Sequence, residues 1–129
     1  AAGALGTEYD GEIFEAHHRL KKDAPSGTAK RLLEIVRSSM KGLAGAAEVA
    51  GRSGLTGERT RNEIGVHAMR GGDIVGEHTV FFTGIGERIE LTHRATSREI
   101  LSKGAVAAFE FLSGRSAGLY SMYDVLGLK

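Results

Sequence analysis

The sequence predicts an α+β fold: a four-stranded mixed sheet with two long helices on one face, which makes a sandwich of two layers. Two observations support this class. Apolar residues recur at helical spacing in two stretches, and β-branched or aromatic residues gather in four short ones. The chain has 129 residues, enough to bury a single core but too few for two full domains with a linker.

The first predicted strand and the first predicted helix are joined by a charged loop. Residues 12–18 hold Ile13 and Phe14 between carboxylates, which suits a partly buried strand. The loop that follows contains Pro25, the one proline of the chain, and proline keeps the preceding residue out of helical dihedrals. A helix is therefore predicted over residues 28–41. Its apolar stripe is Ala29, Leu32, Leu33, Val36 and Met40.

Three further strands are predicted after a long loop. Residues 51–62 follow neither period and are interpreted as the loop. Residues 64–69 alternate in the manner of a strand with two different faces. Residues 73–83 and 87–94 flank Ile85-Gly86 and are predicted to form a hairpin. A two-residue turn there opposes Phe82 to Ile89, Val80 to Leu91, His78 to His93, Thr83 to Arg88, Phe81 to Glu90, Thr79 to Thr92 and Glu77 to Arg94.

The C-terminal part is predicted to be a helix followed by an apolar segment. Thr96 and Glu99 have the spacing of a capping box, so the second long helix is expected over residues 97–113. Gly114 ends it. Residues 115–129 are too apolar for a free tail, and they need a surface to pack against.

Composition excludes several function classes. Basic and acidic residues number 17 and 16, so no overall charge draws the chain to nucleic acid or to a membrane surface. The chain has no cysteine, which excludes disulfides, thiolate zinc sites and thiol nucleophiles. No apolar run approaches the ~18 residues of a membrane span, and no secretory signal is recognisable. A cytoplasmic location is therefore expected.

The most informative stretch begins at a strand end. His17 and His18 are adjacent there and point to opposite sides, so one of them readily enters a given cleft. Histidine exchanges its proton near neutral pH, and Lys21 adds a fixed positive charge within reach of the same cleft.

An anion cradle is predicted directly after these groups. Ser26, Gly27 and Thr28 place backbone amides and hydroxyls at a helix N-terminus, where the helix dipole favours an anion. Lys30 and Arg31 in the first turn have the wrong sign for that dipole, which favours a bound anion further. Together these residues indicate a site for a small carboxylate or phosphate that must receive a proton. The alternative is a solvated basic loop with a simple helix cap.

Other patterns are weaker indicators. His67, His78 and His93 lie on predicted strands, but no carboxylate accompanies them at metal-ligand spacing, so polar-face or interface roles are expected. The glycine-rich residues 51–57 lack the Gly-Lys-Ser/Thr ending of a phosphate-binding loop.

A series of ordered motifs runs through nearly the whole chain. They are Glu15-Ala16-His17-His18-Arg19, Lys21, Asp23-Ala24-Pro25-Ser26-Gly27-Thr28-Ala29, Thr56-Gly57-Glu58-Arg59, Arg70-Gly71-Gly72-Asp73-Ile74-Val75-Gly76-Glu77-His78-Thr79, Gly86-Glu87-Arg88 and Asp124-Val125-Leu126. In these motifs the chain resembles the dihydrodipicolinate reductase family, also called 4-hydroxy-tetrahydrodipicolinate reductase, of the diaminopimelate and lysine pathway.

The resemblance implies roles for the site residues. His17 is implied as the proton donor, Lys21 as its assistant and a substrate contact, and His18, Ser26, Gly27 and Thr28 as contacts of the substrate carboxylates. It also implies reduction of a cyclic dicarboxylate by NADPH or NADH, without a metal, in a homotetramer that assembles through the sheet. Neither nucleic acid nor a membrane is expected as a partner.

The chain departs from the family at its start. Family members begin with a Rossmann domain, and Gly3-Ala4-Leu5-Gly6 lacks the strand and helix that such a glycine-rich turn needs. Residues 1–114 are therefore interpreted as the substrate-binding and oligomerisation domain. Residues 115–129 are expected to pack on a nucleotide-binding domain that is missing here, so the chain alone is expected to be inactive.

Two other function classes remain open. One is a non-catalytic oligomerisation module whose sheet faces self-associate, with Thr79, Phe81, Glu90 and Thr92 on the associating face. The other is a phosphate or nucleic-acid binder that uses Arg19, Lys21, Lys22 and Arg31, against which the near-zero net charge argues.

Overall fold

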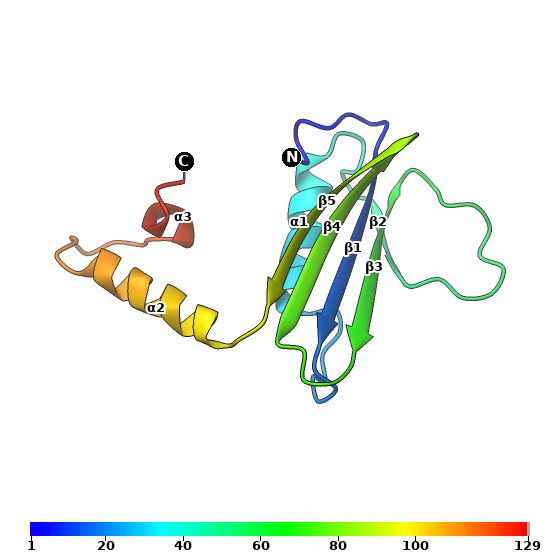
Figure 1. Ribbon diagram of the computed structural model, residues 1–129. Coiled ribbons are helices and arrows are strands. Elements are labelled where there is room, and N and C mark those ends of the chain that lie inside the picture. Colours follow the sequence, from blue (N-terminus) through cyan, green and yellow to red (C-terminus); the bar gives the residue numbers. More distant parts are fainter. Residues whose placement is uncertain (129) are drawn as a thin grey trace. The chain divides into compact units, whose positions relative to one another are not determined.

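A five-stranded mixed sheet forms the frame of the molecule in the computed structural model, which describes residues 1–128. Its strands are β1 (Asp10–His17), β2 (Ala47–Ala50), β3 (Glu63–Arg70), β4 (Gly76–Gly84) and β5 (Glu87–Ala95). Their order across the sheet is β2-β3-β1-β4-β5. The central strand β1 pairs parallel with β3 and antiparallel with β4, so it has a paired strand on each side (Figure 1).

The α+β class is confirmed, but the prediction of four strands is wrong by one. The additional strand is β2, which has four residues and lies at the edge of the sheet. Val49 is its one β-branched residue, and four residues are too few to display an alternating pattern. Only the parallel pairing with β3 defines it as a strand.

The predicted hairpin is confirmed with its register. β4 and β5 pair antiparallel, with His78 opposite His93, Val80 opposite Leu91 and Thr79 opposite Thr92. This register follows from a two-residue turn at Ile85-Gly86, because the turn length alone fixes which residues oppose each other.

One helix, α1 (Gly27–Ser39), covers one face of the sheet in the unit Ala1–Thr96 (Figure 1). Ser26 is its N-cap and accepts a hydrogen bond from the Ala29 amide at 3.2 Å. The buried side of α1 meets alternate residues of the central strands. The larger side chains of this core are Ile13, Leu33, Val36, Met40, Leu43, Ile64, Val66, Val80 and Phe82.

The remaining residues form a second compact unit, Ser97–Lys129, with α2 (Glu99–Leu112) and α3 (Met122–Val125). The predicted capping box at Thr96 is wrong, because Arg98 is the N-cap and the Ser97 hydroxyl accepts from the Glu99 amide at 3.1 Å. No residue of α2 is buried. Large apolar side chains of this unit are exposed: Leu101, Val106, Phe109, Leu119, Tyr123, Leu126 and Leu128.

Every helix in the described part of the chain is too short or too polar to span a lipid bilayer.

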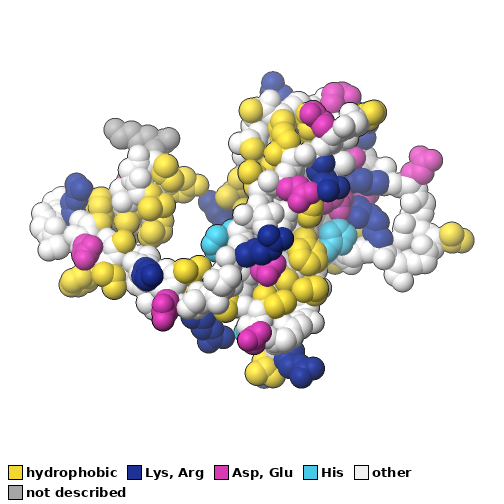
Figure 2. Space-filling view, in the orientation of Figure 1, with side chains coloured by type: hydrophobic (Ala, Val, Ile, Leu, Met, Phe, Trp, Pro, Cys, Tyr) yellow, Lys and Arg dark blue, Asp and Glu magenta, His cyan; other side chains and the backbone are white. Residues whose placement is uncertain are grey.

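On the sheet face opposite α1, Glu12 anchors the long loop that follows β2. Its carboxylate accepts hydrogen bonds from both terminal nitrogens of Arg52, at 3.0 and 3.1 Å, and from Nε of Arg59, at 3.0 Å. It also shares a 2.7 Å hydrogen bond with Nε2 of His67. Gly65 lies opposite Glu12, and a Cβ at that position would overlap the carboxylate. Figure 2 shows acidic and basic side chains interleaved over the strands.

These contacts make stability depend on pH. Burial opposes the charge on Glu12, but hydrogen bonds from Arg52, His67 and Arg59 outweigh it and lower the Glu12 pKa from 4.5 to about 2. A carboxyl group with a lowered folded-state pKa stabilises the fold above its unfolded pKa, and this contribution is lost as the pH falls toward the folded value.

We predict that the free energy of unfolding falls as the pH drops from 4.5 toward 2, and that Glu12→Gln makes the fall shallower. The difference over this window is on the order of 3 kcal/mol. Urea unfolding at a series of pH values measures it, with Glu48→Gln on the exposed part of β2 as the matched control. Identical pH slopes for wild type and Glu12→Gln would contradict the prediction.

Candidate functional site

The candidate site forms at the C-terminal end of β1. Glu15 and His17 are two residues apart on this strand, so their side chains lie on the same face of the sheet, the face that α1 covers. The register places His78 of β4 opposite Glu15 and Arg70 of β3 opposite His17. Four polar side chains therefore converge where α1 begins.

Glu15 is the most deeply buried member of this group, with a side chain that is 0% exposed. Two nitrogens of Arg70 each donate to one of its oxygens at 2.8 Å. The Ser26 amide donates to Oε1 at 3.2 Å, and His17 Nδ1 lies 2.6 Å from Oε2. Burial disfavours the charge on this carboxylate, but the hydrogen bonds from Arg70, His17 and Ser26 prevail and hold the Glu15 pKa below its ordinary value.

His17 contacts both Glu15 and His78. Its ring meets the ring of His78 edge to face, with centroids 5.2 Å apart. While Nδ1 is engaged by Glu15, Nε2 is turned toward Gly76, where an added Cβ would lie 3.1 Å away. The absence of a side chain at residue 76 leaves room beside this nitrogen, and the His17 side chain is 12% exposed.

His78 ties the cradle at the start of α1 to the same cluster. Its Nε2 shares a 3.0 Å hydrogen bond with the hydroxyl of Ser26. Burial and the neighbouring His17 lower the His78 pKa below its ordinary value; the Glu15 carboxylate opposes this, and His93 and Lys21 add smaller lowering contributions. The balance of these effects favours the neutral form of His78 relative to a free imidazole.

Lys21 donates to Asp23 Oδ1 at 2.9 Å, and this hydrogen bond lowers the Asp23 pKa. An ammonium group has three donors, so Lys21 can keep Asp23 and still bind an anionic ligand. Gly27 and Thr28 are exposed in the first turn of α1, where amides have no partner within the helix. The Ser26 amide, in contrast, is already bonded to Glu15.

His18 follows β1 directly and is half-buried. Its carbonyl accepts a hydrogen bond from the Lys21 amide at 3.1 Å, which folds the charged loop back toward the strand end. The structure thus brings His17 and Ser26 together through Glu15 and His78, and Lys21 lies in the loop that joins β1 to α1. It places His18, Gly27 and Thr28 beside them in the chain.

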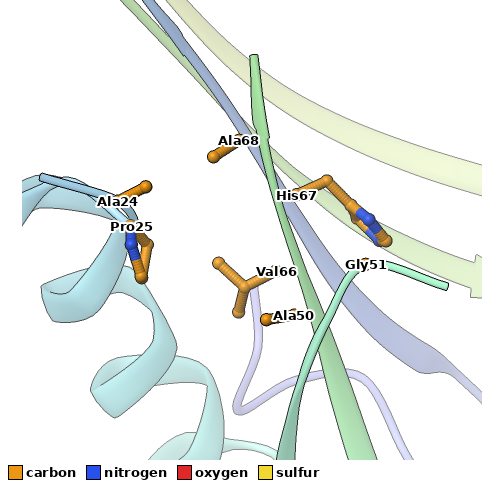
Figure 3. Close-up of a pocket in the computed structure, with 7 residues that line it drawn as sticks. All are labelled: Ala24, Pro25, Ala50, Gly51, Val66, His67 and Ala68. Atoms are coloured by element: carbon orange, nitrogen blue, oxygen red, sulfur yellow. The ribbon is translucent and has the colours of Figure 1, made fainter. Parts of the chain in front are cut away.

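An apolar cavity of about 350 Å³ lies next to this cluster, between the loop before α1 and strands β2 and β3 (Figure 3). Its lining residues are Ala24, Pro25, Ala50, Gly51, Val66, His67 and Ala68. Figure 3 shows the His67 ring on the far side of β3 from Val66 and Ala68. No predicted site residue lines this cavity, and its walls offer little that would hold a charged ligand.

Within residues 1–128, no three His, Cys, Asp or Glu side chains are grouped to hold a metal ion. The described residues also do not fit a nicotinamide dinucleotide. Gly3-Ala4-Leu5-Gly6 lies in turns before β1, and the connection from β1 to α1 is charged rather than glycine-rich.

Comparison with known proteins identifies the family of this chain. The family described as "Dihydrodipicolinate reductase, C-terminus" matches residues 1–126. The chain belongs to this family. Proteins named 4-hydroxy-tetrahydrodipicolinate reductase are close relatives: that of Hahella chejuensis is 57% identical over 128 residues, which is 99% of this chain and 48% of that protein. The Methanocaldococcus jannaschii protein is 54% identical over 121 residues, 94% of this chain and 43% of that protein.

The chain spans about half the length of these dihydrodipicolinate reductases. A solved structure described as dipicolinate-bound dihydrodipicolinate reductase from Paenisporosarcina sp. TG-14 has a TM-score of 0.68 and 22% identity. The match covers 94% of this chain and 46% of the chain in that structure. At that identity the likeness shows the fold, and the sequence relatives show the family.

Three polar members of this candidate site were not foreseen as site residues: Glu15, Arg70 and His78. Each lies in a motif that carries the resemblance, but their convergence depends on β1 pairing with both β3 and β4. A parallel neighbour that arrives after a crossover is not readable from local patterns.

We predict that Gly76→Ala shields His17. The added methyl group would lie 3.1 Å from Nε2 and 3.5 Å from Cδ2 of His17, so it covers the free side of the ring. Modification of His17 by diethyl pyrocarbonate, followed by mass spectrometry, is expected to slow severalfold. Gly71→Ala is the control, because nothing lies within 4 Å of the Cβ that it adds. Equal rates in Gly76→Ala and wild type would show that Nε2 is not exposed along this path.

Proposed function

We propose that this chain is the substrate-binding, proton-donating domain of an NAD(P)H-dependent 4-hydroxy-tetrahydrodipicolinate reductase of the lysine and diaminopimelate pathway, acting in the cytoplasm. The observation that carries the proposal is that His17 lies beside Ser26, the N-cap of α1, because both contact Glu15 and His78. Lys21 lies in the loop that joins β1 to α1. A proton donor, a cation and free amides are what the reduction of an anionic ring requires.

The chemistry divides between two reactants. Hydride adds to one atom of the ring double bond, and the electron pair of that bond moves to the neighbouring atom. That atom takes a proton from Nε2 of His17, which is left with its proton on Nδ1. The product carries both hydrogens, and His17 recovers its proton from solvent.

The carboxylates of the substrate are held by the groups around His17. Lys21 supplies a charge-assisted hydrogen bond, which is stronger than a neutral one. The amides of Gly27 and Thr28 and the dipole of α1 favour a second carboxylate contact, and His18 and Ser26 lie beside them. Two carboxylates bound in this way fix the ring relative to His17.

The hydride comes from NADPH or NADH, and the described residues of this chain do not form its binding site. We assign that site to a nucleotide-binding domain outside the chain. Residues 1–114 are proposed as the substrate-binding and oligomerisation domain. Residues 115–129 are proposed to pack on the nucleotide-binding domain, and the exposed apolar side chains of Leu119 and Leu126 support this assignment.

We also propose that four copies assemble through the sheet. In the unit Ala1–Thr96, α1 is the one helix, so the sheet face opposite α1 carries no helical cover. Thr79 and Phe81 lie on that face among charged side chains, a mixture suited to a self-complementary interface. Assembly without any dicarboxylate binding would favour the alternative, a non-catalytic oligomerisation module.

Substitution of Lys21 is expected to weaken substrate binding. A reductase in which this chain replaces the matching part of the Hahella chejuensis relative is titrated calorimetrically with dipicolinate. Lys21→Ala should raise the dissociation constant more than about tenfold, because the lost charge-assisted contact is worth ~1.5–3 kcal/mol. Lys22→Ala, which removes an exposed neighbouring charge, is the control. An unchanged affinity in Lys21→Ala would remove Lys21 from the substrate site.

Substitution of His17 is expected to affect turnover rather than binding. In the same chimeric reductase, His17→Ala should lower kcat by about 10²–10⁴-fold, the usual contribution of a general acid. Its affinity for dipicolinate should stay near the wild-type value. His18→Ala is the contrasting variant and should mainly raise KM. Equal losses of kcat and affinity in His17→Ala would exclude the acid role.

A further inference from the structure

Glu15 is a charged group in a place where charges are costly. Its side chain is fully buried, and an isolated carboxylate in such surroundings is strongly destabilising. Four hydrogen bonds offset this cost: two from Arg70, one from the Ser26 amide and one with His17. The fold therefore maintains a buried anion in contact with Nδ1 of His17.

The direction of the hydrogen bond between Glu15 and His17 follows from the charge on Glu15. An ionised carboxylate only accepts hydrogen bonds. Arg70 grips both oxygens with its planar fork, so this carboxylate stays ionised and cannot turn away. At 2.6 Å from Oε2, Nδ1 of His17 must be the donor. The proton available for transfer is then the one on Nε2, the nitrogen that faces Gly76.

Arg70 links this arrangement to the charged loop. Besides holding Glu15, its Nη2 donates to the Asp23 carbonyl at 2.7 Å, and the Asp23 side chain accepts from Lys21 at 2.9 Å. One guanidinium thus fixes the orientation of His17 and the loop that carries Lys21. Displacement of the Arg70 side chain would therefore disturb both His17 and the loop that carries Lys21.

We propose that Glu15, gripped by Arg70, is a positioning residue that keeps His17 protonated on Nδ1 and aims its Nε2 at the substrate. This inference rests on the proposed role of His17 as the proton donor. An ion pair that served only the stability of the fold would not need to contact His17. The contact between Glu15 and His17 is therefore assigned to the orientation of the imidazole ring.

The direct test is the tautomer of His17 in this chain. Long-range proton–nitrogen NMR spectra of the imidazoles at alkaline pH distinguish a ring protonated on Nδ1 from one protonated on Nε2. Wild type should show His17 protonated on Nδ1, and Glu15→Gln should show a mixture, because an amide can also donate. A wild-type His17 protonated on Nε2 would overturn the inference without any variant.

The kinetic test uses the chimeric reductase. Glu15→Gln should lower kcat by about 10²-fold while KM stays within about threefold, and Glu15→Asp, which keeps the charge, should recover part of kcat. Glu48→Gln on the exposed part of β2 is the matched control. If Glu15→Gln does not fold, Arg70→Lys tests the same point, since lysine keeps the charge but not the fork.

The outcomes separate this inference from the proposed function. An inactive wild-type chimera, or full kcat in His17→Ala, would refute the proposed function itself. A low kcat in His17→Ala together with a wild-type kcat in folded Glu15→Gln would leave the function standing and refute the positioning role.

Discussion

The ion pair between Glu15 and Arg70 is the interaction on which the site depends. It joins the central strand β1 to β3, and through the Ser26 amide it also reaches the start of α1. A buried pair of this kind contributes little net stability, yet loss of one partner leaves an uncompensated charge in the interior. The pair contributes mainly to geometry. The planar guanidinium fixes the orientation of the carboxylate, and with it the orientation of the His17 ring and the Ser26 amide that are bonded to it.

β1 carries a second glutamate whose partners serve a different purpose. Glu12 points to the sheet face opposite α1, where Arg52 and Arg59 bind it and pin both ends of the long loop. Alternation along one strand thus separates two tasks. One face arranges the proposed proton donor and the proposed anion cradle, and the other orders the loop beside the surface proposed for assembly. Substitution of Glu15 should therefore affect the candidate site, whereas substitution of Glu12 should affect the order of the long loop.

Local patterns carried most of what was predictable from the sequence. The hairpin register followed from turn length, α1 from its apolar stripe, and the candidate groups from their closeness along the chain. Long-range pairing was not predictable: Arg70 and His78 lie 55 and 52 residues from their partners Glu15 and Ser26. β2 was missed because an edge strand of four residues has no pattern of its own. The cap of α2 was mispredicted because the helix begins two residues later than expected, with Arg98 as its N-cap and no side-chain capping hydrogen bond.

The proposed dicarboxylate site lies where β1 ends and α1 begins, and not in the neighbouring apolar cavity. Amide NMR spectra of this chain during titration with dipicolinate distinguish the two places. We expect saturable shifts centred on the amides of His18, Lys21, Gly27 and Thr28, with the imidazole of His17 affected. Shifts centred instead on Ala50 and Val66 in the cavity wall, or no saturable shifts, would contradict it.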